Sequence, residues 1–312
     1  MTGPPPAGTP AARVPSDRRS VREALRALGV RPSRRLGQNF LVDRRARDRV
    51  VAAAAPRPGD LVLEVGPGLG ALTEALAATG AAVLAVEVDA RLAAHLRAAF
   101  AAEPLVRVLQ ADALDGRGGL SGDLVAALAE WRRPASGRLL VASNLPYAAA
   151  TPIVLALLDR EPPPEDLVVT VQREVADRIR AGPGDEAYGP LSVLVQVVAR
   201  AAPVLSLGPS SFLPAPEVSS AVVRVTPDPA LRAAAGDLAA LRRLVHAAFG
   251  QRRKTLGRAL AAAGVADAAA LGRAGVDPRR RGEDLSPAEF IALAAALPGL
   301  ASGPRAGETR AP

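Results

Sequence analysis

The 312-residue sequence contains no cysteine and only two histidines, His95 and His246. The absence of thiols excludes disulfide bonds and thiolate metal sites. The two histidines lie far apart, each within an apolar helical pattern, which argues against a metal centre and against a triad built on histidine. We therefore expect no bound metal ion.

Long apolar segments are also missing, because no run approaches the ~20 residues needed to cross a bilayer. The first residues, MTGPPPAGTPAARVPSD, contain no apolar signal core and are rich in proline and small residues. This composition predicts a disordered tail over residues 1–18, and together with the lack of membrane-length segments it indicates a soluble, cytoplasmic protein without a membrane partner. We also expect the protein to be a monomer.

The charges are unevenly distributed along the chain. Residues 1–50 contain 12 Lys and Arg against 4 Asp and Glu, and residues 227–312 contain 13 against 8. The central residues 51–226 contain 14 against 19. Two basic ends around a mildly acidic centre indicate a polyanionic partner that contacts both ends. All basic residues except Lys254 are arginine, so codon usage could also account for the total charge.

Apolar segments of strand length alternate with helical patterns through the middle of the sequence. Continuous apolar strands that alternate with helices are typical of a parallel sheet covered on both faces, so we predict a Rossmann-like α/β fold. The expected strands are 60–66, 82–89, 106–112, 138–144, 166–172, 193–205 and 219–225, and the expected helices are 20–30, 71–80, 90–100, 121–132 and 151–160.

The pattern becomes entirely helical after a Pro-Asp-Pro segment at 227–229, which we interpret as a linker. The sequence thus predicts a catalytic α/β domain over 19–226, a smaller all-helical domain over 227–300 and a second disordered tail over 301–312. The helices of the smaller domain are expected near 237–249, 253–263, 267–274 and 286–297.

A glycine-rich loop, Gly66-Pro67-Gly68-Leu69-Gly70, joins the first strand of the α/β domain to its first helix. Such loops let the backbone approach a ligand, and a carboxylate that ends the next strand can accept both hydroxyls of a ribose. Glu87 occupies that position, 21 residues after Gly66. These residues also satisfy the dinucleotide fingerprint, so a hydride-transferring enzyme and a purely structural turn remain alternatives.

Three further features favour S-adenosylmethionine as the cofactor. Glu64 would place a carboxylate near the ligand, where it repels a pyrophosphate but suits a cationic amino-acid group. Asp112, after the third strand, could accept a hydrogen bond from an adenine amino group. The fourth strand ends in Asn144-Leu145-Pro146-Tyr147, without the His, Lys or Tyr-Lys pair that a dehydrogenase would use there as its acid/base group. Taken alone, this last segment could also be an ordinary turn with a capping tyrosine.

Taken together, these segments resemble the ribosomal RNA adenine N6,N6-dimethyltransferases, and in particular the members that act on the small ribosomal subunit. The resemblance runs from about residue 33 to 297. It is carried by LGQNFLVD (36–43), EVGPGLGALT (64–73), EVD (87–89), NLPY (144–147), VQREVA (171–176), YGPLSV (188–193), FLPAPEVSSAVVR (212–224), FGQRRKTL (249–256) and RGEDLSPAEF (281–290).

The resemblance implies a Rossmann-like S-adenosylmethionine-dependent methyltransferase sheet with a smaller C-terminal all-helical domain. It implies dimethylation of N6 of two adjacent adenosines in the 3′-terminal hairpin loop of 16S rRNA, and a role in small-subunit biogenesis. The chain departs from the family pattern at Ala148–Ala150 and at Pro190, where polar and basic residues are usual. The resemblance implies that Asn39, Leu41, Gly66, Glu87, Asp112 and Asn144 contact the cofactor, and the glycine-loop argument above adds Glu64 and Gly68 as predicted cofactor-binding residues.

An exocyclic adenine amine is a poor nucleophile, and two acceptors on its protons favour a pyramidal nitrogen with an available lone pair. The Asn144 side-chain oxygen and the Pro146 carbonyl can supply these acceptors while Tyr147 stacks on the base. By resemblance, Phe212 closes the opposite face of the base; a core position is its alternative.

Runs of basic residues are the candidate contacts to RNA phosphates, or else solvated surface. The predicted RNA-binding residues are Arg34, Arg35, Arg252, Arg253 and Lys254, and the run 279–281 is left open. Two other functions remain: a methylase of large-subunit rRNA that confers antibiotic resistance, and a ribosome-assembly factor in which methylation is secondary.

Overall fold

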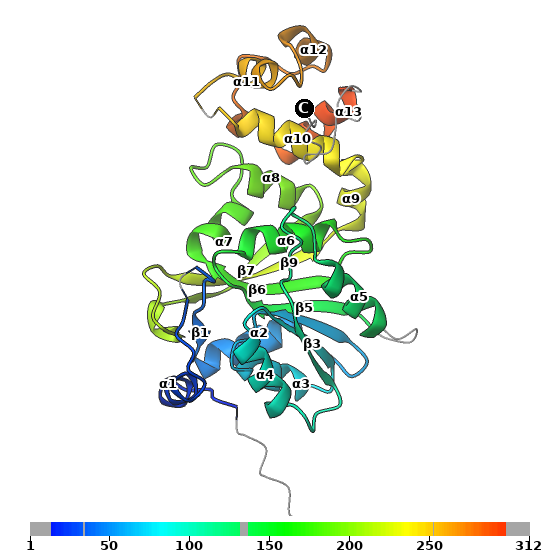
Figure 1. Ribbon diagram of the computed structural model, residues 1–312. Helices are drawn as coiled ribbons and strands as arrows, with labels where there is room; N and C mark the ends of the chain where they lie inside the picture. Colours follow the sequence, from blue (N-terminus) through cyan, green and yellow to red (C-terminus); the bar gives the residue numbers. More distant parts are fainter. Residues whose placement is uncertain (1–13, 34, 132–136, 252, 298–312) are drawn as a thin grey trace, which may run out of the picture.

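The computed structural model describes residues 14–33, 35–131, 137–251 and 253–297 (Figure 1). Its centre is a seven-stranded sheet with the order β4-β3-β2-β5-β6-β9-β7. Only β9 is antiparallel to its neighbours; the other adjacent pairs are parallel. The strands are β2 (Leu61–Val65), β3 (Ala82–Glu87), β4 (Val106–Gln110), β5 (Leu139–Asn144), β6 (Asp166–Gln172), β7 (Ala199–Leu207) and β9 (Ser220–Pro227).

Helices cover both faces of the sheet, which explains why the central strands are apolar throughout. On one face, α2 (Arg44–Ala54) and α3 (Ala71–Ala77) pack on a cluster that includes Val62 and Leu140. The opposite face carries the larger cluster with Leu63 and Val141. Its helices are α5 (Gly122–Trp131), α6 (Ala150–Asp159), α7 (Arg173–Arg180) and α8 (Pro190–Gln196).

The strand order reverses between β2 and β5, since the chain runs from β2 outward to β4 and then returns to β5. A crevice forms outside the carboxyl ends of the strands at such a switch point. The glycines follow the end of β2, and Glu87 and Asn144 are the last residues of β3 and β5. The fold therefore brings the segments selected from the sequence to one edge.

The N-terminal segment packs against this same part of the molecule. Helix α1 (Arg18–Ala27) is capped by Asp17, and the Arg18 guanidinium donates hydrogen bonds to the backbone carbonyls of Ser210 and Phe212. Strand β1 (Phe40–Leu41) pairs with β8 (Phe212–Leu213), and α4 (Ala90–Ala99) packs nearby. Val14 is buried against α4, so the folded part of the chain begins before residue 19.

The last helices form a group beyond one end of the sheet, seen at the top of Figure 1. They are α9 (Pro229–Ala235), α10 (Leu238–Phe249), α11 (Leu256–Ala262), α12 (Ala268–Arg273) and α13 (Pro287–Ala296). The Phe249 ring contacts both Tyr188 and Phe290, at 5.9 and 6.0 Å between centroids. The Tyr188 hydroxyl donates a 2.7 Å hydrogen bond to the Leu285 carbonyl.

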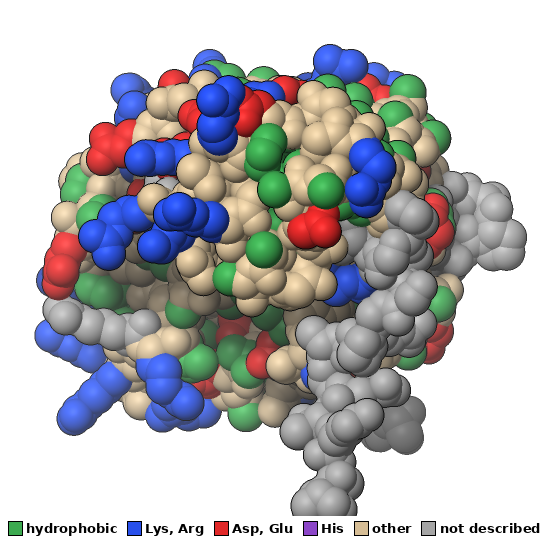
Figure 2. Space-filling view, turned by 90° about the horizontal axis from the view of Figure 1, so that it is seen from above, with side chains coloured by type: hydrophobic (Ala, Val, Ile, Leu, Met, Phe, Trp, Pro, Cys, Tyr) green, Lys and Arg blue, Asp and Glu red, His purple; other side chains and the backbone are tan. Residues whose placement is uncertain are grey.

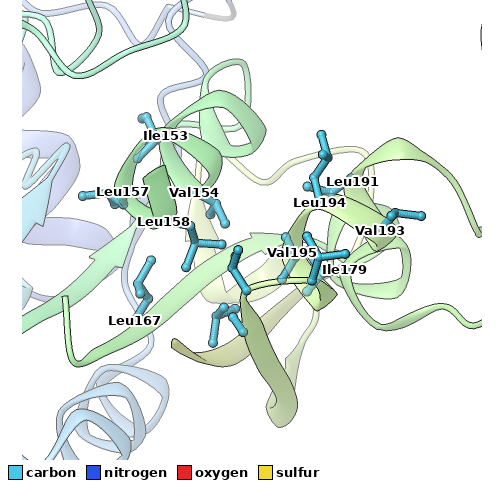
Figure 3. Close-up of a cluster of buried hydrophobic side chains, with 14 of the residues drawn as sticks. Ile153, Val154, Leu157, Leu158, Leu167, Ile179, Leu191, Val193, Leu194 and Val195 are labelled. Atoms are coloured by element: carbon cyan, nitrogen blue, oxygen red, sulfur yellow. The ribbon is translucent and has the colours of Figure 1, made fainter. Parts of the chain in front are cut away.

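One continuous apolar cluster extends from the sheet into this helical group. Figure 3 shows its middle, with side chains of α6 such as Val154 and Leu158 on one side of the view and side chains of α8 such as Leu194 and Val195 on the other. Leu244 of α10 and Leu293 of α13 belong to the same cluster. The division into domains at residue 227 stays a prediction, because apolar packing continues across it.

Several predicted elements need correction. Residues 193–196 lie in α8 rather than in a strand, and β7 begins at Ala199; α7 was not predicted. The segment PLSVLVQ has strand-like composition, but Pro190 at its first turn and burial on the sheet favour a helix. Pro229 begins α9 instead of belonging to a linker. Arg253 and Lys254 lie in a turn before α11, not in a helix.

Within the described ranges, no helix is long and apolar enough to cross a bilayer. In that part of the chain, no three His, Asp or Glu side chains gather in a way that could hold a metal ion.

Candidate active site

A cavity of about 200 Å³ opens at the carboxyl ends of the central strands. Its walls come from the segment before β1, the glycine loop, the ends of β3 and β4, and the loop after β5. All of the cofactor-binding residues predicted from the sequence line it: Asn39, Leu41, Glu64, Gly66, Gly68, Glu87, Asp112 and Asn144. Segments separated by more than 100 residues in the sequence thus meet around one cavity.

The glycine loop holds a backbone conformation that side chains would oppose. Gly68 has a φ of 61°, and a Cβ atom added there would lie 2.9 Å from the Phe40 ring. Gly37 has a φ of 62°, and its Cβ would lie 2.6 Å from the Tyr147 backbone nitrogen. Glycine at these positions lets β1 and its preceding loop close onto both the glycine loop and the segment after β5.

Glu87 is the carboxylate at the end of β3, and only 4% of its surface is exposed. Its Oε2 accepts a hydrogen bond from the Gly68 backbone nitrogen at 3.2 Å, and its Oε1 accepts one from the Asp89 nitrogen at 3.0 Å. Burial raises the pKa of Glu87 despite these hydrogen bonds. Each carboxylate oxygen can accept a further hydrogen bond, so a fixed double acceptor faces the cavity.

Glu64 is the second buried carboxyl group of the cavity, with 1% of its surface exposed. Burial raises the pKa of Glu64 to about 8, and the Glu87 charge adds to this rise. A 2.6 Å hydrogen bond donated by the Thr73 hydroxyl lowers the pKa but does not cancel the effect of burial. Without a cation nearby, Glu64 is therefore mostly protonated at neutral pH. A cationic group in the cavity would favour its ionised form.

Asn144, at the end of β5, is held in one orientation. Its Nδ2 donates a 2.8 Å hydrogen bond to the backbone carbonyl of Asn39. Its Oδ1 is buried and has no hydrogen-bond partner. A buried amide oxygen without a partner costs ~1–3 kcal/mol, so this atom is an acceptor that a ligand could satisfy.

Tyr147 lies next to the cavity but does not line it. Its hydroxyl shares a short hydrogen bond with the Ser220 hydroxyl, and burial raises the pKa of Tyr147 above its usual value of 10. Sequence reasoning assigned no role to Ser220, although it belongs to one of the quoted segments, because the contact joins the turn after β5 to the start of β9, 73 residues later in the chain.

Phe212 is completely buried and meets Tyr147 edge-on, with 6.3 Å between the ring centroids and 73° between the planes. Neither face of the Phe212 ring is exposed in this arrangement. A stacking role for Phe212 stays a prediction, and it would require the ring to become accessible.

The predicted RNA-binding residues are dispersed. Arg35 lines the cavity, whereas Arg253 and Lys254 are exposed in the turn after α10. Arg34 and Arg252 lie outside the described residues. Figure 2 shows the molecule from above, where the surface is hollowed and Lys and Arg side chains gather beside the hollow. Acidic side chains lie inside the hollow.

The sheet order and the cavity together define an S-adenosylmethionine-dependent methyltransferase. The residues present fit this cofactor: buried carboxylates suit a ribose and a cationic amino-acid group. Gly66 and Gly68 line the cavity without a side chain, so their backbone can approach a ligand closely. The Asn144 side chain also belongs to the cavity lining, and its Oδ1 has no hydrogen-bond partner within the protein.

Comparison with known proteins gives the family. The model of the ribosomal RNA adenine dimethylase family matches residues 30–297. A Geobacter metallireducens protein named ribosomal RNA small subunit methyltransferase A is 43% identical over 281 residues, which are 88% of this chain and 99% of the relative. A Kineococcus radiotolerans protein of the same name is 44% identical over 288 residues, 90% and 91% of the two chains. The chain therefore belongs to the ribosomal RNA adenine dimethylase family.

Solved structures agree with this fold. A dimethyladenosine transferase from Plasmodium falciparum aligns with a TM-score of 0.65 at 21% identity, covering 81% of this chain and 95% of that one. The 23S rRNA methyltransferase ErmE aligns with a TM-score of 0.57 at 26% identity, covering 83% and 99%. The predictions of the fold class, of the cofactor and of a methyltransferase acting on ribosomal RNA are confirmed.

Proposed function

We propose that this enzyme dimethylates N6 of two adjacent adenosines in the 3′-terminal hairpin loop of 16S rRNA, within the small ribosomal subunit. Two relatives that share more than 40% of its residues over nearly their whole length are named for the small subunit. Such a substrate places the enzyme in the cytoplasm, where it contributes to small-subunit biogenesis. We further propose that it acts as a monomer without a metal ion.

The observation that carries the chemical part of the proposal is the unpartnered Oδ1 of Asn144. The Asn39 carbonyl fixes the amide, so the oxygen has one orientation and not two. This preorganised acceptor can receive one proton of the adenine amine. The Pro146 carbonyl accepts a 2.9 Å hydrogen bond from the Ala149 nitrogen and keeps a second lone pair for the other proton.

These two acceptors would pull the amine toward a pyramidal geometry in which its lone pair is free to attack. The bound cofactor supplies an electrophilic methyl group on a sulfonium. Alignment of the amine by Asn144 and Pro146 is then the main catalytic contribution of the chain, and well-oriented reactants gain up to ~7–11 kcal/mol. The N6 protons become acidic as the new bond forms, so no strong base is required.

Tyr147 suits stacking and not proton abstraction. Its pKa is raised by burial, so the hydroxyl keeps its proton at neutral pH. The hydrogen bond to Ser220 holds the ring beside Pro146. The target adenosine must leave its stack to enter, which a hairpin loop permits.

On the cofactor side, we assign Glu87 to the ribose hydroxyls and Asp112 to the adenine amino group. Glu64 would face the cationic amino-acid end, where its ionised form becomes favourable. Asn39, Leu41, Gly66 and Gly68 complete the surrounding wall.

A large-subunit methylase is the main alternative, supported by the alignment with ErmE. The similarity to that protein is 26%, against 43% and 44% for relatives named for the small subunit. A role mainly in ribosome assembly is compatible with the same fold and needs a separate test.

Mass-spectrometric mapping of dimethyladenosine in both rRNAs, from cells with and without this chain, tests the proposal. We expect the modification to disappear only from the 3′-terminal hairpin of 16S rRNA in cells without it. Loss from large-subunit rRNA instead would overturn the assignment. Cells that carry only Asn144→Ala separate chemistry from assembly: normal subunit maturation without methylation would indicate that binding is the principal role.

A further inference from the structure

A second cavity, of about 260 Å³, lies between α7 and the outer strands β7 and β9. Helix α7 contributes two arginines to it, Arg173 and Arg180, and β7 contributes the wall opposite. The lining residues are Arg173, Ala176, Asp177, Arg180, Pro203, Val204, Leu205, Ser206, Ala221 and Val223. We refer to this feature as the α7 groove.

One end of the α7 groove adjoins the proposed target-base site. The Arg173 backbone nitrogen donates a 2.9 Å hydrogen bond to the Ser219 carbonyl, and the next residue, Ser220, holds the Tyr147 hydroxyl. Gln172, which precedes Arg173, is the register partner of Ser220. A strand of RNA that presents a base to Tyr147 would therefore pass the Arg173 end of the groove.

The other end of the α7 groove approaches the helical group. Arg180 ends α7, and four residues later the Gly184 nitrogen donates a 3.1 Å hydrogen bond to the Glu283 carbonyl. Arg173 and Arg180 are separated by seven residues, so they share a helix face and lie ~10 Å apart along its axis. The groove thus connects the base site with the basic helical group.

The arginines of the α7 groove differ from their neighbour Arg178. Arg178 is paired with Glu174 one turn away, as expected for a solvated helix surface. Arg180 has no ion pair or hydrogen bond from its side chain within the described residues, and it is exposed. Arg173 has a long contact with Asp177, 3.4 Å between half-exposed side chains, which contributes little and can be exchanged.

The opposite wall offers contacts suited to a ribose-phosphate chain. The Ser206 hydroxyl lies 3.4 Å from the Arg173 guanidinium and can donate to a phosphate oxygen or pair with a 2′-hydroxyl. Strand β7 is the edge of the sheet, with β9 as its only strand neighbour among the described residues. Its pairing shifts register between Pro203 and Leu205, and this irregularity lies in the groove wall.

We propose that the α7 groove binds the phosphodiester backbone of the RNA strand that carries the target adenosine, with one phosphate at Arg173 and Ser206 and another at Arg180. This assignment rests on the proposed function for the identity of the RNA. Asp177 is the one acidic residue of the groove, and it limits the affinity by repelling a phosphate beside Arg173.

The test measures binding of the full chain to unmethylated small ribosomal subunits as a function of salt concentration. Each of Arg173→Gln and Arg180→Gln should weaken binding and reduce the slope of log affinity against log salt by ~1, because one phosphate contact is lost. Arg178→Gln removes the same charge from the same helix and should leave the slope unchanged. Asp177→Asn should tighten binding.

Two outcomes would overturn the assignment: wild-type slopes for both groove variants, or an equal loss for Arg178→Gln, which would indicate a general charge effect. Calorimetry of S-adenosylmethionine binding is the control for folding. We expect every variant to bind the cofactor with wild-type affinity, because the cofactor cavity is unchanged. A failure of the proposed function can be told apart from a failure of the groove assignment. If the proposed function is wrong, the wild-type enzyme leaves the hairpin adenosines unmethylated. The role of the groove is decided separately, by comparing the salt slopes of the variants.

Discussion

The cofactor cavity and the surface that we propose to face RNA use charge in opposite ways. The cavity holds Glu64 and Glu87 almost without solvent, and burial raises both pKa values. The surface instead presents exposed arginines, some paired with carboxylates one turn away and others, such as Arg180, without an acidic partner in the described chain. Removal of one buried carboxyl group should therefore have a large effect on binding, whereas each exposed charge contributes little alone and is screened by salt.

The largest effect is expected inside the cavity, for Glu87→Ala. Loss of two hydrogen bonds to a charged group, at ~1.5–3 kcal/mol each, should weaken S-adenosylmethionine binding by at least about 100-fold. Calorimetry measures the affinity, and circular dichroism should stay native. Glu74→Ala, an exposed carboxylate on α3, serves as the control with unchanged affinity. Unchanged binding for Glu87→Ala would show that this cavity does not hold the cofactor's ribose.

The next largest effect is expected for Asn144→Ala, because Asn144 belongs to the cofactor cavity and is also the proposed acceptor for the target amine. Removal of a preorganised group at the reacting atoms typically costs ~100-fold or more in rate, so single-turnover methyl transfer should fall by about that factor. The loss of cofactor affinity should be smaller than for Glu87→Ala. A wild-type rate would remove Asn144 from the chemistry.

Tyr147 distinguishes stacking from proton transfer. Tyr147→Ala should lower the single-turnover rate by about 10-fold or more through loss of ~1–3 kcal/mol of stacking. Tyr147→Phe keeps the ring and loses only the hydrogen bond to Ser220, at ~1 kcal/mol, so its effect should be milder. Cofactor affinity should be near wild type for both. Equal and severe losses would make the hydroxyl the chemically active group.

Charge reversal of Arg252 together with the exposed Arg253 and Lys254 to Glu should reduce binding to the small subunit and flatten its salt dependence. Exposed contacts contribute about 1 kcal/mol or less each, so the effect per residue is smaller than in the cavity. S-adenosylmethionine binding should persist. If the salt slope stayed at the wild-type value, these residues would be ordinary solvated surface.

The last prediction concerns folding stability, not binding or rate, and is a pH dependence caused by Glu64. Burial raises its folded-state pKa from 4.5 to about 8, so between these values the folded chain keeps a proton that the unfolded chain has lost. Stability from this group is fully present below pH 4.5 and is lost as the pH rises to about 8, by at most about 1.4 kcal/mol per pH unit.

Urea unfolding of the cofactor-free protein across this range measures the effect against Glu64→Gln, in which the decline should be reduced. The buried Glu87 contributes in the same direction and remains in both proteins. Identical pH profiles for the two proteins would mean that Glu64 titrates normally in the folded state.

Local patterns predicted much of this molecule. The alternating apolar segments identified β2 to β6 and their helices, because a strand buried on both faces leaves a continuous apolar run. The glycine loop and Glu87 were recognisable because their roles depend on backbone conformation and on position at a strand end. The family resemblance added Asn39 and Leu41, which no local rule would have selected.

The sequence was less informative where a role depends on distant neighbours. The segment 190–196 has the composition of a strand, and only burial of α8 against the sheet makes it a helix. Phe212 could be placed at the base site by resemblance, yet packing in the core gives it no exposed face here. Glu64 was predicted as an ionised carboxylate near the ligand, but its pKa depends on how completely the fold removes water.

The sequence by itself thus determined the strands β2 to β6, the glycine loop, the strand-end carboxylates and the family, because these follow from local periodicity and from motifs of adjacent residues. Only the tertiary structure decided that Ser220 holds Tyr147, that the Asn39 carbonyl fixes the Asn144 amide, and that two arginines of α7 face a groove. These features arise where β1, β5, α7 and β9 meet. Their residues are distant in the chain, and packing alone sets the distances between them.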